Sequence, residues 1–174
     1  YAIRGSLWCQ GESNNGDGRL YAARMRALVR GWRQAWGMPD MPFYFTQMQG
    51  YGSTDPDEIG MADVRQAQHL FFVNNRAHVG MVVQTDLNPA ATGAIHYGNK
   101  LHPGMRLARW ALAKDYGIAV PYHSPQYKSM EKKENKVVLA FDYVDGGWRP
   151  FDVNEPRGFA IAGEDKKFVW ASAR

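Results

Sequence analysis

The sequence predicts an α/β protein built on a parallel β-sheet with helices on both faces, followed by a β-rich segment. Two observations predict the sheet: three apolar strand-like runs alternate with three helix-like runs, and each strand-like run ends in a loop of polar and glycine residues. Strands that alternate with helices of this length favour a parallel sheet covered on both sides. The third observation is a change after residue 120 to short apolar–polar alternations separated by turn residues, which is typical of β-hairpins.

The elements are expected in a simple chain order. The predicted strands cover residues 2–8, 41–49 and 78–85, and the predicted helices cover 19–36, 61–75 and 99–116. The first and second helices carry apolar residues at helical spacing. Gly37 suits a C-cap for the first helix, and the third helix is expected to end at Gly117.

The later part of the chain predicts two hairpins, with turns at Glu134–Asn135 and near Gly163–Asp165. We therefore divide the chain into part of an α/β domain, residues 1–120, and part of a β-rich region, residues 121–174. Both ends fall within a strand-like pattern, so we expect a longer parent protein.

Composition excludes several classes of function. The formal net charge is +4, but the arginines concentrate on one amphipathic helix, and a solvated helix face explains them better than a nucleic-acid surface. The single cysteine, Cys9, allows no internal disulfide and no thiolate metal cluster. The sequence has no metal-binding motif, no phosphate-binding loop and no apolar run of about 18 residues. We expect no cofactor, no nucleic-acid partner and no membrane span.

Chemistry is expected in the loops that follow the strands, because active residues of parallel α/β folds gather beyond the carboxyl ends of the strands. These loops cover residues 10–18, 50–60 and 86–98. The third contains His96 directly before a helix, where a histidine can act as a general base. On position alone, an ordinary role in contacting the backbone is equally open. His102 is the weaker candidate, and Ser13 is a weak candidate nucleophile.

Six stretches of the chain resemble the sialate O-acetylesterase family, a branch of the SGNH hydrolases, and they occur in the family's order. The first resembles the family's Trp-Tyr-Gln-Gly-Glu-Ser-Asn segment, and the fifth resembles its Ile-His-Pro-x-Asn-Lys block. The stretches are "GSLWCQGESN", "FYFTQMQGY", "ADVRQAQ", "VVQTDLN", "IHYGNKLHPGMRLARWALAKDYG" and "GFAIAGEDKKFVWASA".

The resemblance implies an SGNH-type, flavodoxin-like three-layer fold and a serine esterase that removes O-acetyl groups from sugars, typically sialic acid, without a cofactor. It also favours a location outside the cytoplasm. The family's nucleophile lies in a Gly-Gln-Ser-Asn-Met-like segment upstream of the matched blocks, and no "GQSN" occurs in these 174 residues. We therefore expect the serine to come from a missing N-terminal segment of the same protein, and the chain alone to be inactive.

Carried over residue by residue, the resemblance makes His96 the catalytic base. Gln10, and secondly Asn14, would donate amide hydrogens to the oxyanion, each such donor contributing about 2.7–4 kcal/mol to transition-state stabilisation. The family's carboxylate usually precedes the histidine by two or three residues, where this chain has Ala94 and Gly93. Either Asp86 of the same loop orients His96, or no carboxylate does.

The expected substrate contacts are Gly11, Glu12, Tyr51 and Tyr97, and Glu12 is also expected to anchor its loop by accepting backbone hydrogens. Two alternatives stay open. The Gln10–Asn14 loop could be purely structural, or the protein could be a non-catalytic carbohydrate-binding remnant whose aromatic residues stack on sugars. Those aromatic residues would be Trp8, Tyr51, Tyr97 and Trp148.

Overall fold

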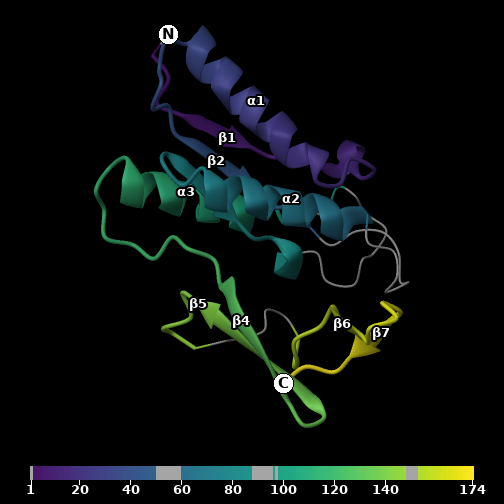
Figure 1. Cartoon of the computed structure of the whole chain (residues 1–174). Coiled ribbons are helices and arrows are strands. Elements are labelled where there is room, and N and C mark those ends of the chain that lie inside the picture. The colour runs from purple at the N-terminus through teal and green to yellow at the C-terminus, as the bar shows by residue number, and fades with distance from the viewer. Residues whose placement is uncertain (1, 50–59, 88–95, 97, 148–152) are drawn as a thin grey trace.

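A three-stranded parallel sheet lies among the helices of the first part of the chain (Figure 1). The computed structural model describes residues 2–49, 60–87, 96, 98–147 and 153–174. The sheet consists of β1 (Ser6–Trp8), β2 (Phe43–Thr46) and β3 (Val79–Val82), in that order and all parallel. Three helices follow the strands in turn: α1 (Leu20–Ala35), α2 (Gly60–Asn74) and α3 (Leu101–Lys114). The predicted α/β order is confirmed.

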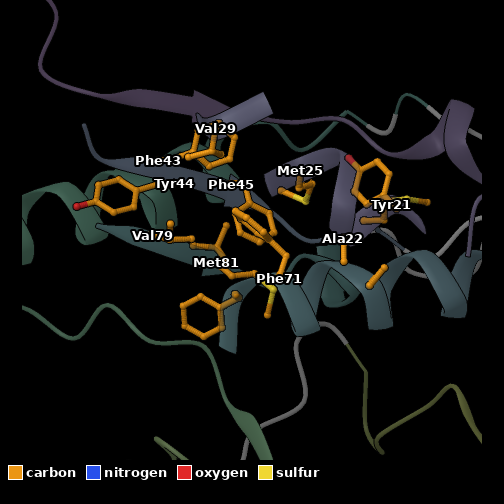
Figure 2. Packing of buried hydrophobic residues seen from close by; sticks show 14 of the residues in the cluster. Tyr21, Ala22, Met25, Val29, Phe43, Tyr44, Phe45, Phe71, Val79 and Met81 are labelled. Atoms are coloured by element: carbon orange, nitrogen blue, oxygen red, sulfur yellow. The ribbon is translucent and has the colours of Figure 1, made fainter. Parts of the chain in front are cut away.

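Helices cover both faces of this sheet. Successive residues of a strand point to opposite sides, so the contacts of β2 show which helix covers each face. Phe43 and Phe45 point to one side, where they contact Phe71 of α2 at ring-centroid distances of 6.5 and 5.7 Å. Tyr44, between them, points to the other side and lies 5.8 Å from the ring of Trp110 in α3. Figure 2 shows Phe45 and Phe71 packed together with Met25 of α1. The three-layer architecture is therefore confirmed.

Gly80 allows α3 to lie close against the sheet. A Cβ atom at this position would lie 2.5 Å from ring atoms of Trp110 and 2.7 Å from Cδ1 of Tyr44. Trp110 is 3% exposed, and it occupies the space that a side chain on β3 would otherwise fill. Close packing of this kind leaves no room for a larger residue.

The strands are shorter than the sequence predicts, and Pro42 supplies one reason. The backbone nitrogen of Ser6 donates to the carbonyl of Pro42 at 2.8 Å. Pro42 has no backbone N–H with which to extend the ladder towards the residues before Ser6. The parallel pairing of β1 with β2 therefore begins only at Ser6 and Phe43. Both helix-ending glycines are found as predicted: Gly37 and Gly117 have φ angles of 62° and 67°, in the left-handed region that favours glycine.

The later part of the chain forms two hairpins, as predicted. β4 (Gln126–Lys133) pairs antiparallel with β5 (Lys136–Asp142), and β6 (Phe159–Ala162) pairs antiparallel with β7 (Phe168–Ala171). Each hairpin is a separate two-stranded sheet. The division of the chain at residue 120 stays a prediction. Across the described residues, no helix is long and apolar enough to span a membrane.

His123 links the α/β layers to the first hairpin. Its ring lies 4.9 Å from Trp110 of α3 on one side and stacks on Tyr143, just after β5, at 3.7 Å on the other. The neighbouring Ser124 accepts a hydrogen bond from the backbone nitrogen of Val83 at 3.1 Å. These contacts hold the segment after α3 against the end of β3.

Candidate active site at the carboxyl edge of the sheet

The loops after β1 and β3 leave the same edge of the sheet, because the strands are parallel. A short 3₁₀ helix, η1 (Glu12–Asn14), follows β1, and a second one, η2 (Thr85–Leu87), follows β3. Gln10, Asn14 and Asp86 therefore lie at the edge where the sequence predicts the active site. The loop that follows β2 from residue 50 lies outside the described residues.

Tyr21 of α1 holds the side chain and the backbone of Gln10. Its hydroxyl lies 2.8 Å from Oε1 and 2.9 Å from the backbone oxygen of Gln10, so its single hydrogen can serve either acceptor. Tyr21 is 3% exposed, and burial raises the pKa of its hydroxyl above the ordinary value. The hydroxyl therefore stays protonated at neutral pH and acts as the donor in this contact.

The contacts that run from Tyr21 to Asp17 fix the orientation of two amide side chains. Because Oε1 of Gln10 faces Tyr21, its Nε2 faces Asn14 and donates to Oδ1 at 2.6 Å. Asn14 in turn donates from Nδ2 to Asp17 Oδ2 at 2.5 Å, and Asp17 forms an ion pair with Arg24 of α1. An amide nitrogen carries two hydrogens, so Gln10 and Asn14 each keep one hydrogen that this relay does not use.

Gln68 of α2 holds the loop after β1 through a contact with the backbone of Gln10. Its side chain is fully buried and accepts a hydrogen bond from the backbone nitrogen of Met48 at 2.8 Å. Its Nε2 lies 3.3 Å from the backbone oxygen of Gln10 and 3.4 Å from that of Thr46. One amide thus joins the ends of β1 and β2, and the buried polar groups satisfy one another.

This role of Gln68 was not predicted, although the sequence carries a signal for it. Gln68 follows Val64 by four residues and precedes Phe71 by three, so it lies on the apolar face of α2. A polar residue in that position is costly to bury unless it is paired. A second buried pair lies behind the edge, where Gln84 donates to Gln49 at 3.2 Å.

Gly11 has a packing role in the structure. It is buried, and a Cβ atom there would lie 2.5 Å from the sulfur of Met48, which is itself 1% exposed. The backbone of the loop can therefore approach β2 only without a side chain at this position. The predicted contact between Gly11 and substrate stays a prediction.

Glu12 does not anchor the loop as the sequence suggested. Among the described residues, its carboxylate forms no hydrogen bond, and only its backbone oxygen accepts one, from Asn15 at 3.3 Å. The anchoring groups are Tyr21, Gln68 and Asp17 instead. The half-buried carboxylate of Glu12 is left available, and its predicted role in binding substrate stays a prediction.

Asp86 is paired with an arginine of α3. Arg106 donates from Nη1 to Oδ1 at 2.8 Å and from Nη2 to Oδ2 at 2.6 Å, which is the bidentate geometry that arginine forms with carboxylates. The same guanidinium donates to the backbone oxygen of Val83 at 2.6 Å. The start of the third loop is thereby tied to α3.

The remaining predicted residues lie partly outside the described chain. His96 is exposed and, among the described residues, has no hydrogen-bond or ion-pair partner. The structure therefore does not bring Asp86 and His96 into contact. His102 lies in the first turn of α3, as predicted, with Nδ1 2.9 Å from Oδ1 of Asn99, and its rank as the weaker candidate stays a prediction. Tyr51 and Tyr97 lie outside the described residues, as do Ala94 and Gly93.

Within the described ranges, no group of three histidine, cysteine, aspartate or glutamate side chains could hold a metal ion. Gln10 and Asn14, at the end of β1, offer the unused amide hydrogens, while the end of β3 offers a carboxylate held by arginine. Directed amide hydrogens can stabilise a developing negative charge on oxygen.

The fold, with amide and carboxylate side chains at the carboxyl edge of its sheet, defines a class of protein. The class is a three-layer α/β domain of the SGNH hydrolase type. The model of a family described as carbohydrate esterase, sialic acid-specific acetylesterase, matches residues 1–113, which is more than half of the chain. The chain belongs to this family. The family predicted from the six sequence blocks is therefore confirmed.

Individual relatives agree. The chain is 29% identical over 156 residues to the sialate O-acetylesterase of Rattus norvegicus and 28% identical over 156 residues to that of Mus musculus, and each match covers 81% of this chain. A crystal structure of a carbohydrate acetylesterase from Xanthomonas citri is similar with a TM-score of 0.77, at 30% sequence identity, over 99% of this chain. The chain spans only 29% of the two curated relatives and 40% of the solved one.

Proposed function

We propose that the protein to which this chain belongs hydrolyses O-acetyl esters of sialic acid or related sugars by serine catalysis. The observation that carries the proposal is the family match over residues 1–113, which includes the Gln10–Asn14 loop and His96. The relay from Tyr21 through Gln10 to Asn14 supports it, because it orients two amides at the carboxyl edge before any substrate arrives. By family membership we also propose that the protein acts outside the cytoplasm.

The proposed reaction uses a serine that we place outside these 174 residues. Its Oγ attacks the acetyl carbonyl carbon while His96 takes the hydroxyl proton, and the carbonyl oxygen becomes an oxyanion facing the free hydrogens of Gln10 and Asn14. The bond between carbonyl carbon and sugar oxygen then breaks, and His96 returns the proton to that oxygen. Water, deprotonated by His96, then attacks the acetyl-serine, which releases acetate and restores the serine hydroxyl.

The serine is proposed to come from a Gly-Gln-Ser-Asn-like segment of the same protein outside these 174 residues. Ser13, the serine nearest to the relay, is exposed in η1, and the family resemblance matches it to a serine that is not the nucleophile. Asp86 is the candidate carboxylate for orienting His96, and Arg106 would set its position.

The experiment is aryl-acetate hydrolysis by this chain and by a longer form of the protein that carries the serine segment. We expect turnover only in the longer form, loss on His96→Asn, and retention with His78→Asn. His78 is a matched control because it is also exposed but precedes β3, at the opposite end of the sheet. Turnover by the 174-residue chain that His96→Asn abolishes would contradict a nucleophile outside it.

A second assay tests the sugar specificity and the alternative function, a non-catalytic carbohydrate-binding remnant. Acetylated sialic acid should be deacetylated faster than an acetylated neutral sugar such as acetylxylose. Saturable sugar binding without turnover by the longer form would instead favour the carbohydrate-binding remnant. The absence of an acid at Ala94 and Gly93 is the sequence feature that keeps that second function in view.

A further inference from the structure

A groove of about 540 Å³ lies between α1 and α2 at the amino end of the sheet. Its wall includes Val79, the first residue of β3, and Pro39 from the segment that precedes β2. The candidate active site lies beyond Val82, the last residue of β3, about 10 Å further along the strand. The groove is therefore separate from the candidate active site, and it has the size of a small-molecule site.

Three arginines of α1 line this groove. Arg26, Arg30 and Arg33 are spaced by four and three residues, so they follow one another along one face of the helix. No aspartate or glutamate lines the groove, and within the described part of the chain none of the three arginines forms an ion pair. The exposed carboxylate of Asp40 acts on Arg33. Among the residues that the structure describes, Arg26 and Arg30 have no ion-pair partner.

Arg33 is already held in position. Its Nε and Nη2 donate to the backbone oxygen of Met41 at 3.1 and 3.0 Å, and Nη2 also lies 3.3 Å from that of His78. The Nη1 hydrogens are not used by these contacts. A guanidinium fixed in this way loses little side-chain freedom when it binds an anion.

The floor of the groove is apolar. Val29, Phe71 and Val79 lie beneath the groove and are at most 4% exposed, so the floor meets a ligand mainly through Pro39, which is exposed. A ligand that suits both floor and rim needs an anionic group of about two charges joined to an apolar body. A phosphate monoester carries between about 1.5 and 2 negative charges at neutral pH, and arginine binds its oxygens in two-pronged pairs.

We propose that this groove binds an organic phosphate monoester, with the phosphate on Arg26, Arg30 and Arg33 and the organic part on the apolar floor. This inference is independent of the proposed esterase function, because it uses no residue of the carboxyl edge.

Isothermal titration calorimetry of the 174-residue chain tests the proposal, with phenyl phosphate, inorganic phosphate and phenol as separate probes. We expect saturable binding of phenyl phosphate at one site, weaker binding of inorganic phosphate, and none of phenol. Arg26→Gln with Arg30→Gln should weaken phenyl phosphate binding about tenfold or more. The control pair is Arg109→Gln with Lys132→Gln, which removes the same charge from exposed positions on α3 and β4 and should change binding less than about twofold.

Three results would overturn the proposal. Equal losses in both double variants would mean attraction by net charge alone. Inorganic phosphate binding as tightly as phenyl phosphate would remove the role of the floor. A short DNA duplex that binds more tightly than phenyl phosphate, with a steep dependence on salt, would make the arginines a nucleic-acid surface instead. Thermal melts of all variants, followed by circular dichroism, confirm that a lost signal is not lost folding.

Discussion

The hydroxyl of Tyr21 lies 2.8 Å from Oε1 of Gln10 and helps to hold that amide with its oxygen facing α1. From the other side, the carboxylate of Asp17, which can only accept, holds Asn14 so that its Oδ1 faces the nitrogen of Gln10. A hydrogen-bond donor at the oxyanion position stabilises negative charge, whereas an oxygen there would repel it. Tyr21 and Asp17 together thus set the chemistry that the end of β1 can offer.

Tyr21→Phe should loosen this orientation while the ring stays packed. The variant loses one buried hydrogen bond, so we expect the free energy of unfolding to fall by about 1 kcal/mol. The side-chain amide resonances of Gln10 should shift and broaden in NMR spectra. Tyr116→Phe is the control, because Tyr116 is 58% exposed. Unchanged Gln10 resonances in Tyr21→Phe would contradict the positioning role.

Gly80→Ala should destabilise the fold, because the added methyl group would meet Trp110 and Tyr44. Overpacking of this kind costs about 1–3 kcal/mol, measured by urea denaturation. Gly31→Ala is the control: Gly31 lies in α1, and a Cβ atom there meets nothing within 4 Å. It should be neutral or stabilising, since alanine favours helices more than glycine does. Equal stability of the two variants would contradict the close packing of α3 on β3.

Asp86→Asn should weaken the tie between the third loop and α3. The pair with Arg106 is half-exposed, so we expect a loss of about 1 kcal/mol or less in unfolding free energy. Activity of the longer form separates two roles. If Asp86 orients His96, Asp86→Asn should lower kcat far more than Arg106→Lys does. If Asp86 only holds the loop, the two variants should lower activity and stability together.

Acid should destabilise the chain through His123. Burial, and then the charges of Lys114 and Arg76, lower the pKa of His123 below its ordinary value of 6.5, and Tyr122 and Tyr143 enclose its ring. The unfolded chain therefore binds a proton more readily than the folded chain, so this stability is present above pH 6.5 and is lost as the pH falls below it.

Thermal melts from about pH 7.5 to about pH 5 test this expectation. His123→Phe keeps a ring between Trp110 and Tyr143 but cannot gain a proton, so its melting temperature should fall less steeply with acid. His69 also has a pKa lowered mainly by burial, so part of the acid dependence should remain. Identical pH profiles for the parent chain and His123→Phe would rule out this source of acid sensitivity.

Much of the fold could be predicted because it depends on local patterns. The order of strands and helices follows from apolar periodicity, and the helix ends follow from Gly37 and Gly117. The position of the polar loops also followed, since parallel strands place their carboxyl ends at one edge. The lengths of the strands were harder to predict from the sequence, because the pairing of Ser6 with Phe43 depends on a neighbouring strand and on Pro42.

For the candidate active site, too, some residues could be predicted from the sequence and others could not. Gln10, Asn14 and Asp86 could be named from their places after strands and from the family's motif. Gln68 and Tyr21 could not, because each acts on a residue distant in the chain: Gln68 reaches Gln10 across 58 positions and Tyr21 reaches it across 11. Glu12 was expected to anchor a loop that these two residues anchor instead.

The sequence alone thus determined the family, the alternation of elements and the edge at which polar residues gather, because these are written in neighbouring residues. Only the tertiary structure decided which hydrogens of Gln10 and Asn14 the relay leaves unused, that Asp86 pairs with Arg106, and that three arginines of α1 share a groove with α2. The physical reason is that a hydrogen bond or a charge cluster depends on distances of a few ångströms between groups, and those distances are set by how the helices pack on the sheet.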